Sequence, residues 1–249
     1  MHVRQAANVF DLMEFFERRR APATLAEIAD ALGWPRSSTF NLVGTIVEKG
    51  YLYEPRPRAG YYPTPRWLSL AQALAESEPL PEAALALVRE IAAQTGETTA
   101  LATISGVHAL FLEVVESPHS VRYHARTGDR VPIHASSVGR ALLVQLPEAQ
   151  RTAIYRRIAF ERFSDTTPMS PGSIERELSA GTERGFHQSS SEYIPDLAGV
   201  SLPLPGSSRQ LSVVVAGPTS RCLEIRPATA AIMIRARGRH FGTALGQTA

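Results

Sequence analysis

The stretch that decides the fold is residues 24–50, which read TLAEIADALGWPRSSTFNLVGTIVEKG. Thr24 and Glu27 form a capping-box pair, in which each side chain accepts a hydrogen bond from the other residue's amide, so a helix begins here. Gly33 ends that short helix because glycine tolerates the left-handed backbone of a tight exit. Pro35 suits the first turn of a second helix, which runs to the last glycine of the stretch. This order predicts a helix-turn-helix.

The second helix of this motif divides into two faces. Phe40, Val43 and Val47 are expected to face the core, with Leu42 and Ile46 at its edge. Hydroxyl and amide groups at the N-terminal end of a helix can read base edges in the major groove or bind phosphate. The pattern predicts a DNA-reading helix, and the alternative is an ordinary amphipathic surface helix. The candidate DNA contacts are the small or polar residues Arg36, Ser37, Ser38, Thr39, Asn41 and Thr45.

A basic β-hairpin is predicted directly after this helix. Two β-type segments, residues 51–53 and 61–64, are joined by the turn sequence EPRPRAG. We expect Arg56 and Arg58 at the tip of the hairpin, held extended by the prolines that precede them. A basic hairpin in this position is typical of a wing that reaches phosphates or the minor groove.

Composition favours a compact protein of the cytoplasm. The chain has 249 residues, of which 44% are hydrophobic and 20% charged, so a packed core is expected and disorder is not. Its one cysteine, Cys222, cannot form a disulfide framework and fits a reducing compartment. No apolar run is long enough to span a bilayer, and the N-terminus lacks a secretory pattern. We therefore expect a cytoplasmic protein with no membrane partner.

The net charge of +2 is unevenly distributed. Residues 1–66 carry nine basic and seven acidic side chains, a difference of +2, so the remainder of the chain is neutral. This excess indicates that the N-terminal part meets a polyanion. A nonspecific DNA-coating protein usually has a much larger basic excess, which argues against an architectural role.

The rest of the chain predicts an α+β layout, in which helices cover one central antiparallel sheet. Helices are expected at residues 4–19, 67–75, 81–95, 147–158, 171–184 and 226–245, with a further short helix after the loop at 134–136. Strands are expected at residues 98–104, 107–115, 121–126, 186–193, 200–204 and 211–216, with a loop at 127–132. The domains are expected to be a DNA-binding domain over 1–66, a linker over 67–80 and a second domain over 81–249.

The residues indicate neither catalysis nor a metal site. The histidines do not fall at zinc-ligand spacing, and His134 is better explained as a residue that fixes its loop. The serines at 189–191 lack the Gly-x-Ser-x-Gly elbow of a hydrolase. We therefore predict no catalytic residue, no metal and no cofactor. The alternative, an enzyme domain fused to a DNA-binding module, would need a nucleophile–base pair or a metal site.

The chain resembles the IclR family of transcription regulators over nearly its whole length. Each matching motif is weak alone, and their order carries the resemblance. The motifs are LAEIA and LG within 25–33, PRSST at 35–39, EKGYL at 48–52, TGET at 95–98, VESP at 115–118, GDRVP at 128–132, HAS at 134–136, GRALL at 139–143, ERGF at 183–186 and AGP at 216–218. The resemblance implies a winged helix-turn-helix, a linker helix, and a C-terminal effector-binding domain similar to GAF and PAS sensors. It also implies operator DNA as a partner, and dimers that often pair into tetramers.

The resemblance further implies an effector pocket lined from three parts of the second domain. These are the loop after the His-Ala-Ser motif, one position after the Gly-Phe pair, and the last two strands: Ser136, Ser137, Val138 and Gly139; Ser189; and Leu197, Gly199, Val214 and Ala216. The family's carboxylate binders carry a Cys or Ser near Gly199 and serines where this chain has Val214 and Ala216. We therefore expect a bulkier or more apolar effector, such as an aromatic acid, in place of a two- or three-carbon acid. An effector-independent DNA-binding protein is the alternative.

Overall fold

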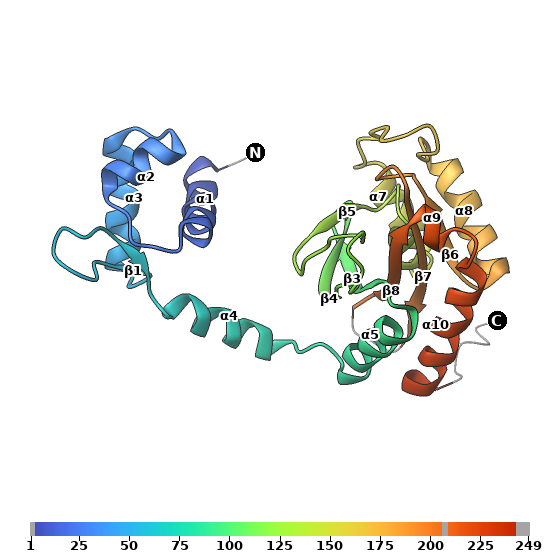
Figure 1. Ribbon diagram of the computed structural model, residues 1–249. Helices are drawn as coiled ribbons and strands as arrows, with labels where there is room; N and C mark the ends of the chain where they lie inside the picture. Colours follow the sequence, from blue (N-terminus) through green and yellow to red (C-terminus); the bar gives the residue numbers. More distant parts are fainter. Residues whose placement is uncertain (1–2, 206–208, 243–249) are drawn as a thin grey trace. The chain divides into compact units, whose positions relative to one another are not determined.

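A computed structural model describes residues 3–205 and 209–242 of the chain. The chain forms two compact units, residues 1–79 and 80–249, and each has its own hydrophobic core (Figure 1). The last three residues of the helix predicted at 226–245 lie outside the described residues.

The N-terminal unit packs three helices and a small hairpin around one core. Its elements are α1 (Arg4–Arg19), α2 (Leu25–Leu32), α3 (Arg36–Glu48), β1 (Leu52–Tyr53), β2 (Tyr62–Pro63) and α4 (Arg66–Ser77). Residues from α1, α2, α3 and β1 form the core, among them Leu12, Phe16, Ile28, Val43 and Leu52. The predicted helix-turn-helix and the predicted bounds of α1 are confirmed.

The capping box predicted at the start of α2 is confirmed. The Thr24 hydroxyl accepts a hydrogen bond from the Glu27 amide at 3.3 Å, and the Glu27 carboxylate accepts one from the Thr24 amide at 2.8 Å. This backbone hydrogen bond, together with one from Arg19, lowers the pKa of Glu27 to about 2. Gly33 ends α2 with the expected left-handed backbone, at φ 64°. Local sequence signals therefore fix both ends of α2.

The faces of α3 differ from those predicted. Thr39, Val43 and Ile46 form the buried line at the spacing i, i+4, i+7. Phe40 is 63% exposed, so its predicted place in the core is wrong. Thr39 can be buried because its hydroxyl donates a hydrogen bond to the Pro35 carbonyl at 3.1 Å. Pro35 occupies the N-cap position just before α3 begins, so it is not the first-turn residue that we expected.

The hairpin forms as predicted, but its tip is a turn. β1 and β2 pair antiparallel. At the base, Gly60 has φ 87°, and a β-carbon there would lie 2.3 Å from the carbonyl carbon of Ala23. At the tip, Arg58 has φ 63°, and the Ala59 amide donates to the Arg56 carbonyl at 2.9 Å. The expectation of an extended tip is wrong because this hydrogen bond closes the loop locally.

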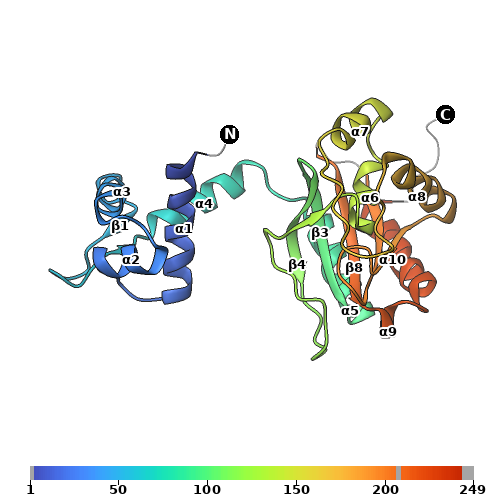
Figure 2. The ribbon, with the colours of Figure 1, turned by 90° about the horizontal axis from the view of Figure 1, so that it is seen from above.

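The second unit is built on an antiparallel sheet with the strand order β5-β4-β3-β8-β7-β6. Figure 2 shows three of these strands, β4, β3 and β8, side by side in that order. Its strands are β3 (Thr98–Ser105), β4 (His108–Val115), β5 (Arg130–Pro132), β6 (His187–Ser190), β7 (Leu197–Leu204) and β8 (Leu211–Pro218). Its helices are α5 (Glu82–Thr95), α6 (Ser137–Leu143), α7 (Glu148–Tyr155), α8 (Pro171–Arg184), α9 (Thr219–Cys222) and α10 (Arg226–Phe241). The predicted α+β class is confirmed.

The two faces of the sheet pack against different helices. Leu101 and Val213 pack with α5 and α10 on one face, whereas Ala100, Ala102 and Val214 pack with α6 on the other. This alternation follows from the two-residue period of a strand. The α6 face carries the smaller side chains, so the helix approaches the sheet closely and a hollow remains beside it.

Two predictions at one edge of the sheet are wrong. Residues 121–126, predicted as a strand, form no strand, and Arg130–Pro132, predicted as a loop, form β5. β5 pairs with His108–Leu110 of β4 and so occupies the edge that residues 121–126 would have joined. Elsewhere α7 and β6 end three residues earlier than expected, and the four-residue helix α9 was not predicted because it is too short to show a period.

All seven residues of α6 are buried, and Gly139 in its first turn permits this packing. A β-carbon at Gly139 would lie 2.1 Å from the carbonyl oxygen of Ile133. We expect Gly139→Ala to lower the free energy of unfolding of the second unit by about 2–3 kcal/mol, because the surrounding backbone must shift. Urea denaturation of the full chain, followed by circular dichroism, measures this loss.

Gly172 provides the matched control, because it also lies in the first turn of a helix. The nearest atom to its β-carbon position is Nη1 of Arg176 at 3.9 Å, so Gly172→Ala should leave the unfolding free energy unchanged or slightly raised. Equal stability of the two variants would contradict the close packing of α6.

Candidate functional site

The first turns of α3 present a polar surface to solvent. Thr39 is the exception among the predicted DNA contacts, since it is fully buried and its hydroxyl bonds to the Pro35 carbonyl. We therefore remove Thr39 from the candidate DNA surface. The Thr45 hydroxyl donates to the Asn41 carbonyl at 2.8 Å, which leaves its oxygen lone pairs available to a partner. The exposed members are Arg36, Ser37, Ser38, Asn41 and Thr45.

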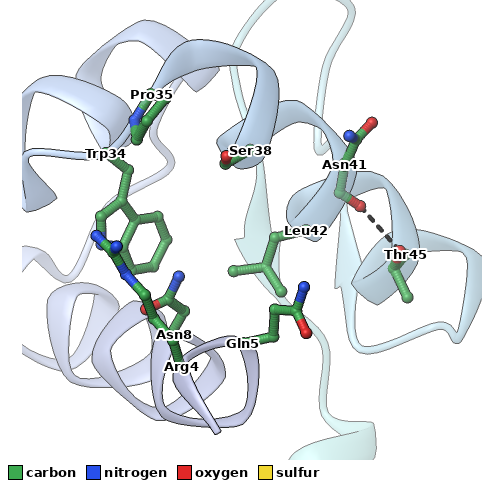
Figure 3. A pocket seen from close by; sticks show the side chains of 9 residues that line it. All are labelled: Arg4, Gln5, Asn8, Trp34, Pro35, Ser38, Asn41, Leu42 and Thr45. Carbon is green, nitrogen blue, oxygen red and sulfur yellow. Dashed lines mark hydrogen bonds between the residues drawn. The ribbon is translucent and has the colours of Figure 1, made fainter.

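A groove of about 720 Å³ lies between α1 and α3 (Figure 3). Figure 3 shows Arg4, Gln5 and Asn8 of α1 on one side of this groove, facing Trp34 and Leu42. The other lining residues are Pro35, Ser38, Asn41 and Thr45. Our sequence reasoning missed the contribution of α1, although the i, i+4 spacing of its polar residues marks one face of the helix. The groove widens the polar surface beyond α3.

The wing adds two exposed guanidinium groups. Arg56 and Arg58 both lie on the exposed turn of the hairpin, as predicted. The Glu54 carboxylate accepts a hydrogen bond from the Arg58 amide at 2.6 Å and so fixes the turn. Cationic side chains on a fixed loop are suited to contacts with phosphate groups.

The second unit contains a separate pocket where the start of α6 meets the sheet. Its volume is about 40 Å³. Gly139 does not line it, because this residue packs against Ile133 and its amide donates to the Ser136 hydroxyl. All the other residues that we predicted for the effector site come together here: Ser136, Ser137, Val138, Ser189, Leu197, Gly199, Val214 and Ala216.

The pocket also has walls that the sequence reasoning did not identify. Tyr123 reaches it from the segment wrongly predicted as a strand. Tyr193 and its neighbours reach it from the loop between β6 and β7. Ser189, a predicted pocket residue on β6 just before this loop, was the only sign in the sequence that the loop lies near the pocket. The added residues are Phe111, Tyr123, Val131, Ala135, Glu192, Tyr193 and Ile194. The enlarged set makes the pocket mostly apolar and partly aromatic.

A few hydrogen-bonding groups are placed among these apolar walls. The Ser137 hydroxyl belongs to the lining, and it lies 2.8 Å from the hydroxyl of Ser201, which does not line the pocket. Burial raises the pKa of Tyr123 to about 12, so its phenol keeps its proton and can donate a hydrogen bond. Ser189 contributes a further hydroxyl to the lining. The pocket therefore offers donors to an anionic or hydroxylated ligand while its walls favour an apolar body.

Residues 191–196, which we call the cap, cover one side of the pocket. The Glu192 carboxylate accepts hydrogen bonds from the Arg140 guanidinium at 2.7 and 2.9 Å. Arg140 is fully buried in α6 and also donates to the carbonyl of Gln188. This ion pair ties the cap to the helix that lines the pocket.

A cluster of rings supports the cap from the far side of Tyr193. The Phe163 ring contacts Tyr193 edge-on, with centroids 5.0 Å apart, and lies 5.8 Å from the His134 ring. His134 Nε2 is 3.2 Å from the Glu161 carbonyl, and burial lowers the pKa of this histidine. A neutral imidazole that donates to this carbonyl fixes the loop before α6.

The described part of the chain shows neither a candidate metal site nor a candidate membrane-spanning helix. There, His, Cys, Asp and Glu side chains do not gather in groups of three or more that could hold a metal ion. In that same part, no helix combines the length and the apolar character that crossing a membrane requires.

Comparison with known sequences gives matches to both units. Residues 5–56 match the IclR helix-turn-helix domain, and residues 72–241 match the C-terminal domain of bacterial transcriptional regulators of the IclR type. The chain is 24% identical over 237 residues to the HTH-type transcriptional repressor AllR of Escherichia coli K12, which covers 94% of this chain and 88% of that protein.

Comparison with solved structures gives the same fold. The Thermotoga maritima IclR structure matches with a TM-score of 0.78 at 18% identity, covering 99% of this chain and 100% of that one. An IclR homolog from Microbacterium hydrocarbonoxydans, solved in complex with 4-hydroxybenzoate, matches with a TM-score of 0.70 at 23% identity, covering 95% and 97%. Because the two domain matches occur in order and together span most of the chain, this protein belongs to the IclR family of bacterial transcriptional regulators.

Proposed function

We propose that the protein regulates transcription by binding operator DNA in a sequence-specific manner, and that a small aromatic acid in the pocket of the second unit alters this binding. It acts in the cytoplasm and without catalytic turnover. The observation that carries the DNA half of the proposal is the exposure of the polar first turns of α3, namely Arg36, Ser37, Ser38, Asn41 and Thr45.

These side chains have the chemistry that base reading requires. An arginine can bond to both acceptors of a guanine edge, and an asparagine can bond to both groups of an adenine edge. Arg56 and Arg58 of the wing, with Arg4 of the α1 groove, suit the backbone phosphates. We assign sequence preference to α3 and general affinity to the wing and the groove.

This division of roles predicts different defects for different variants. On a duplex selected from a randomised pool by the full-length protein, Asn41→Ala should lower affinity by about 10- to 100-fold and change the preferred base at one position. Arg56→Ala should weaken all duplexes alike and reduce the slope of log affinity against log salt by about one. Fluorescence anisotropy over a range of KCl concentrations measures both effects.

Arg162→Ala, at an exposed arginine of the second unit, is the control and should leave DNA affinity unchanged. An equal loss on selected and random duplexes for Asn41→Ala would contradict base reading by α3. A wild-type protein that prefers no sequence would contradict the whole DNA half of the proposal.

The case for an aromatic effector rests on the lining of the pocket. Phe111, Val131 and Leu197 give apolar walls, while Ser137 and Tyr123 give hydrogen-bond donors. The Microbacterium relative was solved with 4-hydroxybenzoate, a ligand of the same character. A cavity of about 40 Å³ is smaller than the roughly 150 Å³ in which a benzene ring has been accommodated, so the cap must move for such a ligand to enter.

Isothermal titration calorimetry on the full chain tests the effector class. We expect 4-hydroxybenzoate or benzoate to bind more tightly than glyoxylate or pyruvate. Gly199→Ala should weaken binding of the aromatic acid by about tenfold or more. The β-carbon of the new alanine would lie 2.8 Å from the Ser137 hydroxyl oxygen and 3.0 Å from that of Ser189.

The control for this measurement is again Gly172→Ala, which lies outside the pocket lining and should bind like the wild type. Tighter binding of glyoxylate or pyruvate would contradict the aromatic class. If none of the acids binds or alters DNA affinity, the protein is an effector-independent DNA-binding protein and this half of the proposal fails.

We also propose that two copies of the chain pair through α4. This helix has no buried residue, and its Leu68 and Leu74 side chains are 61% and 64% exposed. Covering such side chains removes apolar surface from water. Paired copies would present two α3 helices to a palindromic site.

Sedimentation analysis of a variant with Leu68→Glu and Leu74→Glu tests this pairing. We expect the assembly to fall to monomers, or to dimers if a second interface pairs the dimers into tetramers. Gln72→Glu, at an exposed position of the same helix, should keep the wild-type assembly. An unchanged sedimentation coefficient in the double variant would contradict pairing through α4.

A further inference from the structure

The exposed face of α3 contains two residues that its own packing does not explain. Phe40 is 63% exposed in the middle of the helix. Gly44, one turn later, is also exposed. A ring that stays largely exposed contributes little to stability, and glycine inside a helix is less stable than alanine, so the stability of this unit explains neither residue.

No steric constraint within the described part of the chain requires a glycine at position 44. A β-carbon added at Gly44 would meet nothing within 4 Å. Gly60, in contrast, would bring its β-carbon to 2.3 Å from a backbone carbon. A bare position on this solvent-facing surface leaves room for something outside the chain to approach the helix backbone.

Phe40 and Gly44 lie on the same face because residues four apart in a helix are neighbours. Ser37, three residues before Phe40, belongs to this face as well. The buried line through Thr39 and Val43 prevents α3 from turning to bury the ring, since a turn that did so would expose the core side chains. The ring is thus held outward, with a hydroxyl on one side and a position without a side chain on the other.

We propose that Phe40 is a specificity-determining residue that packs against the C5-methyl group of a thymine in the operator, while Gly44 gives the edge of the groove room to approach α3. The inference rests on the proposed function, because it needs α3 in the major groove. Thymine is the one base whose major-groove edge carries an apolar group, and phenylalanine is among the side chains that contact it. Phe40 therefore selects thymine where a polar side chain would select a different base.

Deoxyuridine substitution isolates this contact, because it removes the methyl group and leaves base pairing intact. In the duplex that the full-length protein selects from a randomised pool, each thymine is replaced in turn by deoxyuridine. We expect at least one replacement to lower wild-type affinity by about fourfold, the value of one buried methyl group. Phe40→Ala should show no further loss at that same position, and this double-mutant cycle identifies the pair.

Phe10→Ala is the matched control, because Phe10 is also exposed, at 66%, but lies on α1 and outside the lining of the α1–α3 groove. It should retain the full sensitivity to the methyl group. Phe40→Leu should keep part of that sensitivity, since leucine is still apolar. Circular dichroism of Phe40→Ala should match the wild type, because removal of an exposed ring leaves the core intact.

Gly44→Ala tests the second half of the inference with two readouts of opposite sign. The variant should melt at the wild-type temperature or above it, because alanine favours the helix and meets no neighbour. Its affinity for the selected duplex should nevertheless fall by about tenfold. An alanine that leaves DNA affinity unchanged would overturn the role assigned to Gly44.

The outcomes separate this inference from the proposed function. If the protein selects a duplex but no deoxyuridine substitution affects binding, or if Phe40→Ala keeps the wild-type sensitivity, the thymine contact is wrong and the regulator proposal stands. If the pool yields no preferred duplex, the proposed function itself fails.

Discussion

The orientation of α3 about its own axis depends on one buried hydroxyl group. Thr39 donates that hydroxyl to the Pro35 carbonyl one turn earlier, so the side chain can join Val43 and Ile46 in the core without leaving a polar group unpaired. Each residue of a helix is displaced by about 100° from the next, so burial of Thr39 turns Phe40 outward. The side chains that α3 presents at its surface are therefore determined from inside the unit, by those that the core accepts.

In the second unit, small side chains determine how closely a helix packs against the sheet. Ala100 and Ala102 let α6 approach the sheet, and this approach both forms the pocket and buries Arg140. A buried guanidinium needs its partner, because removing Glu192 would leave an uncompensated charge that costs several kcal/mol. Cap movement that keeps this ion pair intact is less costly than movement that breaks it. The pair thus limits the ways in which the pocket can open.

Local sequence patterns were enough to predict most of the helices and strands. The capping box at Thr24 fixed the start of α2, because a cap involves only neighbouring residues. The face of α3 was mispredicted because hydrophobicity places phenylalanine above threonine, and it takes no account of a hydroxyl satisfied within its own helix. The strand predicted at 121–126 failed for a nonlocal reason, since whether a β-type segment pairs depends on which segment already occupies the sheet edge. Most of the pocket positions came from the family resemblance, and Tyr123 could not have been found without the folded chain.

The small volume of the pocket bears directly on regulation. A ligand alters a conformational equilibrium only if it binds one state better than the other. Because a cavity of about 40 Å³ is too small for an aromatic ring, we expect such a ligand to bind a state in which the cap has moved, which we call the open state. Any aromatic effector must therefore discriminate between two states, and its apparent affinity falls in proportion to how rarely the open state is populated. By thermodynamic linkage, DNA changes the affinity for the effector by the same factor as the effector changes the affinity for DNA. Such coupling factors typically lie between about 5- and 150-fold.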